Sequence, residues 1–175
     1  MLFRSATLAA TQSAMQHMRA SGKTVSFDPN LRPALWRDAA HMRTTLNALA
    51  AQADWVLPGL DEGRQLTGQD TPEGIAAFYR AAGAAKVIVK LGAQGAYFDS
   101  AAACGYVAAS PVARVVDTVG AGDAFAVGVI SGLLENLSLP DAVRRATWMG
   151  ARAVQARGDT EGLPTRAQLQ ASHLS

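Results

Sequence analysis

The sequence lacks the features of a secreted or membrane-spanning protein. Its single cysteine, Cys104, cannot form an internal disulfide or a zinc cluster, and it predicts a free thiol in a reducing compartment. No apolar run approaches the ~20 residues needed to span a bilayer. The first residues, from Met1 onward, are too polar for the core of a signal peptide. We therefore expect a cytoplasmic protein without membrane contact.

Charge is also sparse. Charged residues make up 17% of the chain, and 16 basic against 14 acidic side chains leave a net charge of +2. The basic residues are scattered singly except for Arg144-Arg145. A protein that follows a nucleic-acid backbone needs a basic stripe, so we expect no nucleic-acid partner.

The remaining composition is that of a globular domain. The chain has 175 residues, of which 49% are hydrophobic, which is enough for one packed core and too apolar for a disordered chain. No repeat, low-complexity linker or charge block marks a domain boundary, so we expect residues 1–175 to belong to one domain.

Hydrophobic spacing predicts alternating helices and strands. Helices are expected over 5–20, 38–52, 71–83, 121–136 and 140–156, and strands over 24–28, 55–57, 86–91, 96–99, 105–109 and 112–117. In the fourth helix Ala121, Ala124, Gly128 and Gly132 form a ridge of small residues that allows close packing. This alternation is typical of an α/β protein with a mainly parallel sheet and flanking helices.

The most informative segment is VDTVGAGDAF, residues 116–125. It joins a β-branched run to a helix through Gly120-Ala121-Gly122, and it places Asp123 in the first helical turn. Unpaired amides at a helix N-terminus favour an anion, and residues without bulk let a phosphate approach the backbone. A carboxylate beside such a site can take the proton from a hydroxyl that attacks phosphorus. The alternative is an ordinary first-turn acid behind a flexible turn.

The longer segment DTVGAGDAFAVGVISGLL resembles the C-terminal signature of the PfkB (ribokinase-like) carbohydrate kinases. The resemblance implies a ribokinase-like, Rossmann-like fold and phosphoryl transfer from ATP to a sugar hydroxyl. It implies that Asp123 is the catalytic base and that the amides of Gly120, Ala121 and Gly122 form an anion hole.

Other segments agree with this resemblance in order. VKLGAQGAY is similar to the strand and turn beside the nucleotide, which implies ATP contacts at Lys90, Gly92 and Gly95; an ordinary hairpin turn is the alternative. Thr147 falls where the family lines the adenine pocket, although a helical threonine can also bond to the preceding turn.

The segment LPGLDE takes the place of the family's Asn-x-x-Glu element, which helps to hold magnesium through water. Glu62 matches this element, whereas Gly59 replaces the asparagine. The acidic residue suited to a hydrated Mg²⁺ is therefore kept. The alternative is that Asp61 and Glu62 are simply first-turn helix acids.

DPNLRPALW resembles a segment of the family's fructokinase and ketodeoxygluconate kinase branches. It makes Asn30 and Arg32 candidates for substrate contact, because an arginine can grip a carboxylate or phosphate with two parallel bonds. A turn with a solvated arginine is the alternative. LPG at 57–59 and GDTEGLPT at 158–165 favour the ketodeoxygluconate kinase branch. In related kinases the closing loop, with the backbone near Asp117 and Val119, can hold a monovalent cation such as K⁺.

The resemblance covers only the C-terminal part of such a kinase. No segment matches the N-terminal part, which carries most sugar contacts and a β lid, so we expect an exposed strand edge and an apolar face where further strands would lie. The implied function is an ATP-dependent sugar-acid kinase, with fructokinase, another sugar kinase of the family or an inactive nucleotide-binding remnant as alternatives. Partners would be ATP, a sugar or sugar acid, a second copy, or a separate N-terminal half.

Overall fold

The computed structural model describes residues 5–172. The helices in this part are α1 (Ser5–Ala20), α2 (Ala39–Ala50), α3 (Leu60–Thr67), α4 (Pro72–Ala81), α5 (Ala121–Leu134), α6 (Leu139–Ala153) and α7 (Arg166–Ala171). The strands are β1 (Ser26–Phe27), β2 (Trp55–Val56), β3 (Lys86–Lys90), β4 (Ala96–Ser100) and β5 (Cys104–Val107), with 3-10 turns η1 (Pro33–Leu35) and η2 (Gly92–Gln94).

The strands follow one another in the sheet in the order β1-β2-β3-β4-β5. The first three are parallel: Ser26 lies opposite Trp55, and Trp55 lies opposite Lys86. β3 is buried along its centre, as expected for a parallel strand covered on both faces. The predicted α/β class with a mainly parallel sheet is therefore confirmed.

The helix starts follow the capping rules. The side chain of Asp38 accepts the amide of His41 at 2.7 Å at the start of α2. Thr71 accepts the amide of Gly74 at 3.1 Å at the start of α4, whose first turn begins with Pro72. These are the residue types that satisfy unpaired helix amides, which explains why the helix boundaries agree closely with the sequence pattern.

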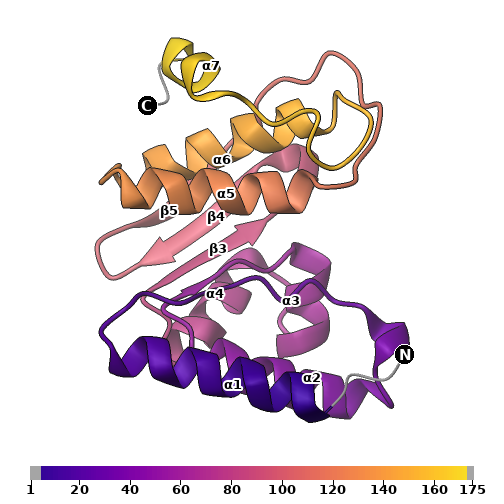
Figure 1. Cartoon of the computed structure of the whole chain (residues 1–175), viewed down its shortest axis with the longest axis vertical. Helices are drawn as coiled ribbons and strands as arrows, with labels where there is room; N and C mark the ends of the chain where they lie inside the picture. The colour runs from indigo at the N-terminus through magenta and orange to yellow at the C-terminus, as the bar shows by residue number, and fades with distance from the viewer. Residues whose placement is uncertain (1–4, 173–175) are drawn as a thin grey trace. The chain divides into compact units, whose positions relative to one another are not determined.

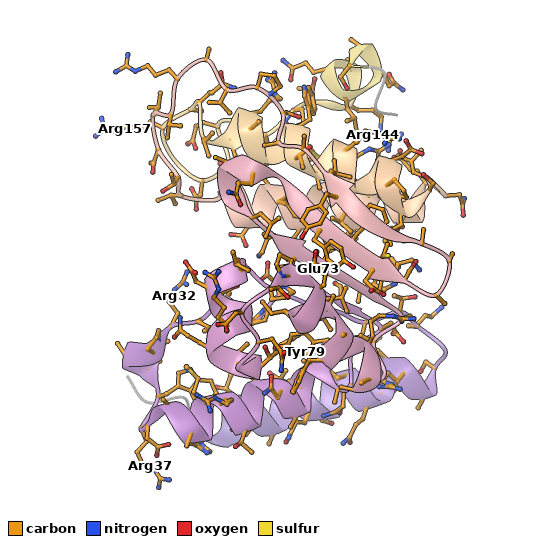
Figure 2. The ribbon with its side chains drawn as sticks, turned by 180° about the vertical axis from the view of Figure 1, so that it is seen from behind. Arg32, Arg37, Glu73, Tyr79, Arg144 and Arg157 are labelled. Carbon is orange, nitrogen blue, oxygen red and sulfur yellow. The ribbon has the colours of Figure 1, made fainter. Side chains whose placement is uncertain are left out.

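The chain divides into two compact units. The first comprises Met1–Val89 with Asp99–Ala103, and the second comprises Lys90–Phe98 with Cys104–Ser175. The core of the first unit is built from apolar side chains of α2, α3 and α4, namely Met42, Leu46, Leu49, Leu66, Ile75 and Tyr79. Tyr79 lies in the interior of this unit (Figure 2). Its hydroxyl donates to Oδ1 of Asn47 at 3.2 Å, so the buried polar atom is satisfied.

In the second unit α5 and α6 run alongside each other (Figure 1). A Cβ on Gly128 would lie 2.4 Å from Cα of Ala146, and a Cβ on Gly132 would lie 2.8 Å from Cβ of Ala142. The two helices therefore approach at distances that only glycine permits. This confirms the predicted role of the small-residue ridge at Gly128 and Gly132.

The predicted strand over 112–117 is wrong, because this segment has no regular secondary structure. Pro111 has no amide to donate, and the side chains of Val115 and Val116 are 61% and 50% exposed. The amide of Val116 donates to the carbonyl of Val154, at the end of α6, at 2.7 Å rather than to a strand. β-branched residues predict a strand only where a partner strand is available.

Two further expectations concern the surface. β1 ends the strand order, so within residues 5–172 it has a strand neighbour on one side only, as predicted. The apolar face predicted beside it stays a prediction. None of the helices over 5–172 combines the length and the apolar character that crossing a membrane requires.

Candidate active site

The turn at the start of α5 has a conformation that requires glycine. Gly120 occupies the N-cap position with φ of 75°, in the left-handed region. A Cβ at this position would lie 2.5 Å from the carbonyl oxygen of Asp159. Gly120 is therefore needed both for the backbone angle and for the close approach of the loop that follows α6.

The first turn of α5 presents amides without a side-chain cap. The amide of Ala121 donates a long bond, 3.3 Å, to the carbonyl of Thr118. The amide of Gly122 has no backbone acceptor within residues 5–172. Uncapped amides at a helix N-terminus can bind an anion. The anion hole over 120–122 stays a prediction.

Asp123 lies in the same first turn and is exposed. A carboxylate here is stabilised by the positive end of the helix dipole. The side chain is thus accessible to a ligand and also fulfils the simpler role of a first-turn acid.

Asp117 ties together the two loops on either side of α5 and α6. Oδ1 accepts the amide of Val119 at 3.1 Å, and Oδ2 accepts the amide of Gly158 at 3.3 Å. These bonds, that of Val119 foremost, hold the pKa of Asp117 below its ordinary value. The carboxylate therefore fixes the turn that leads into Gly120.

A cavity of about 590 Å³ lies within the second unit. Its lining includes six of the residues singled out from the sequence, Lys90, Gly92, Gly95, Ala121, Gly122 and Thr147. The Nζ of Lys90 lies 3.7 Å from the position that a Cβ on Gly122 would take. The ammonium group of Lys90 thus lies close to the uncapped first turn of α5. The ammonium group and the helix N-terminus both favour a negative charge.

The glycines after β3 also have structural roles. Gly92 and Gly95 have φ of 58° and 98°. A Cβ on Gly95 would lie 2.0 Å from the carbonyl oxygen of Val107. Gly95 is therefore required for the close approach of two backbones, whatever it contacts in the cavity.

Thr147 is buried on α6. Its hydroxyl donates to the carbonyl of Arg144 at 2.9 Å, and it lies 3.4 Å from the hydroxyl oxygen of Ser110. The bond to the preceding turn that the sequence left open is therefore present, and Thr147 also lines the cavity. Arg144 itself is exposed (Figure 2).

In the first unit, Asn30 and Arg32 lie on the loop between β1 and η1. Both side chains are exposed, and Asn30 has φ of 42°, in the left-handed region that asparagine tolerates better than most residues. Nη1 of Arg32 donates to the carbonyl of Leu31 at 3.0 Å. Figure 2 shows Arg32 at the periphery of this unit. The guanidinium keeps further N–H groups for a ligand.

Glu62 makes two backbone hydrogen bonds. Oε2 accepts the amide of Gly59 at 2.8 Å, as in a capping box, and Oε1 accepts the amide of Leu31 at 2.7 Å. Glu62 is thus a first-turn acid of α3, as the alternative interpretation held. Within residues 5–172, no group of three or more His, Cys, Asp or Glu side chains could hold a metal ion. The contact of Glu62 with magnesium through water stays a prediction.

The sequence analysis did not identify several of these residues. Ser110, Val112 and Val115 line the cavity, but the pattern there predicted only strands, over 105–109 and 112–117. The side-chain bonds of Asp117 could have been suspected, because aspartate before a glycine turn commonly accepts an amide two residues on.

These observations define an α/β protein in which α5 begins with an uncapped N-terminus, with a lysine nearby and an acid in the first turn. The comparison with known proteins gives the family. Residues 2–166 match the family described as pfkB family carbohydrate kinase, and the chain belongs to this family.

Individual relatives and solved structures agree with this family assignment. The chain is 57% identical over 165 residues to the 2-dehydro-3-deoxygluconokinase of Bacillus subtilis (strain 168), covering 94% of this chain and 51% of the relative. The PfkB protein from Polaromonas sp. JS666 is 58% identical with a TM-score of 0.86, covering 95% of this chain and 52% of that one. A ribokinase II of Escherichia coli, solved in complex with ATP and Mg²⁺, is 32% identical with a TM-score of 0.87, covering 97% and 54%. The chain thus spans about half the length of these relatives.

Proposed function

We propose that this chain is the C-terminal, nucleotide-binding and catalytic part of a kinase that transfers a phosphoryl group from ATP to a hydroxyl of 2-keto-3-deoxygluconate. The observation that carries the proposal is the start of α5, where Asp123 follows uncapped amides and where Ala121, Gly122 and the nearby Lys90 line one cavity. The 57% identity to a 2-dehydro-3-deoxygluconokinase supports the choice of substrate.

In the proposed reaction Asp123 accepts the proton of the attacking hydroxyl, because its carboxylate is exposed and lies in the first turn of α5 beside the uncapped amides. The amides over 120–122 stabilise negative charge on the transferring group. Lys90 adds a positive charge beside them, and Asp117 holds their turn in place. Each of these groups acts by position and electrostatics, as phosphoryl transfer requires.

ATP supplies the transferred group, and the cavity of about 590 Å³ is within the size range of ligand sites. Gly92 and Gly95 leave the backbone accessible there, and the Ser110 and Thr147 hydroxyls offer polar contacts to the adenine base.

Mg²⁺ would be held through phosphate and water, with Glu62 as the acidic residue. K⁺ is a further proposed cation, near the backbone of Asp117 and Val119. We infer a cytoplasmic setting, because Cys104 is free and exposed.

Arg32 and Asn30 are proposed to meet the substrate. Arg32 has free donors on an exposed loop, and a planar guanidinium suits the carboxylate of a sugar acid. The loop segment DPNLR is shared with fructokinases of the family, so fructokinase or another sugar kinase is the alternative activity.

A second candidate is a nucleotide-binding protein without turnover. Transfer needs an acceptor held in line and water excluded, and residues 1–175 span about half the length of the relatives, so these residues by themselves could bind a nucleotide without turnover. We propose that an N-terminal part or a second copy completes the enzyme, and the edge of β1 can pair with a further strand.

A titration with ATP followed by a coupled kinase assay tests these alternatives. ATP binding and turnover on 2-keto-3-deoxygluconate supports the kinase, and turnover on fructose instead supports the alternative substrate. ATP binding without turnover, restored by adding an N-terminal half, supports the two-part enzyme. If the chain does not bind ATP, the proposal is wrong.

A further inference from the structure

The carboxylate of Glu62 links two segments that are far apart in sequence. Its bond to Gly59 is local and caps α3. Its bond to the amide of Leu31 crosses 31 residues to the loop after β1, at 2.7 Å. Both oxygens therefore take part in charge-assisted hydrogen bonds, which are stronger and more directional than neutral ones.

Leu31 lies at the centre of the loop that carries the proposed substrate contacts. Its side chain is buried, whereas Asn30 and Arg32 on either side are exposed. Its amide donates to Glu62, and its carbonyl accepts Nη1 of Arg32 at 3.0 Å. The backbone amide and carbonyl of Leu31 thus connect the Glu62 carboxylate to the Arg32 guanidinium.

The loop needs such support because its backbone is unfavourable without it. Asn30 has φ of 42°, which costs free energy for a residue with a Cβ and persists where neighbouring contacts fix it. Leu31 directly follows Asn30, and the hydrogen bond from its amide to Glu62 holds the turn in place.

Gly59 fits the same arrangement. A Cβ at this position would lie 3.2 Å from Oε2 of Glu62, which is tighter than an ordinary contact. Because position 59 is glycine, Oε2 of Glu62 can accept the amide of Gly59 while Oε1 accepts the amide of Leu31. Glycine in place of the family's asparagine at 59 is therefore compatible with a Glu62 carboxylate that binds two backbone amides.

We propose that Glu62 is a positioning residue, which sets the conformation of the 30–32 loop and through it the direction of the Arg32 guanidinium. The claim that Arg32 contacts the substrate rests on the proposed function. The claim that Glu62 fixes the 30–32 loop does not rest on it, and each claim has its own test.

The test compares the whole chain with Glu62→Gln by ¹H–¹⁵N NMR. In the unchanged protein the Leu31 amide proton should be shifted downfield and protected from exchange. In Glu62→Gln we expect its exchange to accelerate by about tenfold or more, because a charge-assisted bond is lost or replaced by a neutral one. Asp61→Asn is the matched control: Asp61 is exposed and pairs with Arg64 at 3.1 Å on the same helix, so Leu31 should not change.

An unprotected Leu31 amide in the unchanged protein would overturn the proposal, and so would equal Leu31 exchange in Glu62→Gln and Asp61→Asn. The first of these measurements needs no variant and holds even if Glu62→Gln unfolds. A second arm titrates 2-keto-3-deoxygluconate without ATP or Mg²⁺: weaker binding in Glu62→Gln than in Asp61→Asn supports the link to Arg32, and equal binding in the two variants overturns that link. No binding by the unchanged protein counts against the proposed function, while Leu31 exchange still decides the role of Glu62.

Discussion

Replacing Gly120 by alanine tests the backbone geometry that presents the amides of α5. Alanine at φ of 75° is in the left-handed region, which costs about 1–2 kcal/mol. Its Cβ would also lie 2.5 Å from the Asp159 carbonyl oxygen and 2.8 Å from Asp159 Cα, so backbone must move at a cost of about 1–3 kcal/mol. We therefore expect Gly120→Ala to lower the free energy of unfolding by about 2–5 kcal/mol.

Gly122→Ala is the matched control two residues further on. Gly122 is helical and exposed, and the nearest atom to an added Cβ is Lys90 Nζ at 3.7 Å, an ordinary contact. Alanine in a helix is favoured over glycine by up to about 1 kcal/mol, so stability should be kept or raised. ATP affinity should nevertheless fall, because the methyl group would separate a phosphate from the amides.

Urea unfolding and ATP titration of both variants measure the two effects. The reasoning predicts that stability falls only in Gly120→Ala and that ATP affinity falls in both. Equal stability of Gly120→Ala and the unchanged protein would refute the account of this turn.

Two further predictions concern neighbouring contacts. The Val119 and Gly158 amides lower the pKa of Asp117 below its ordinary value of 3.8, so the stabilisation is present above pH about 4 and is lost as the pH falls through the folded-state pKa. Asp117→Asn should therefore weaken the acid dependence of unfolding between pH about 2 and 5, and an unchanged pH profile would contradict this. Gly128→Ala should cost about 1–3 kcal/mol by forcing α5 away from Ala146, whereas Val127→Ala, at a side chain 48% exposed, should change thermal stability by less than about 0.5 kcal/mol.

The elements with local signals could be predicted from the sequence. α4 begins at the Thr71-Pro72 cap, and β3 coincides with a β-branched run. The ridge through Gly128 and Gly132 predicts close packing, and its partners in the structure are Ala146 and Ala142. Local capping and packing preferences are visible in sequence because they depend on residues near in the chain.

The errors and omissions have a different origin. The segment over 112–117 has strand propensity, but the amides of Val116 and Asp117 donate to the carbonyl of Val154 at the end of α6 instead of to a strand. The bond from Leu31 to Glu62 joins residues 31 positions apart, and no spacing rule predicts it. α7 was missed although Thr165 and Gln168 form a capping box at its start. Asp123 can be proposed as the base from the sequence because its motif is local, whereas the contacts of Asp117 and Glu62 depend on the tertiary fold.

The central claim is that Asp123 takes the proton from the attacking hydroxyl. The most direct test is the rate of 2-keto-3-deoxygluconate phosphorylation at saturating ATP by the active enzyme, alone or completed by its N-terminal half, with Asp123 or Asp123→Asn. The account predicts a loss of about 10²–10⁴-fold in kcat, because asparagine cannot accept the proton, while ATP affinity is kept and stability changes by no more than about 1 kcal/mol. An Asp123→Asn enzyme with unchanged kcat would contradict it.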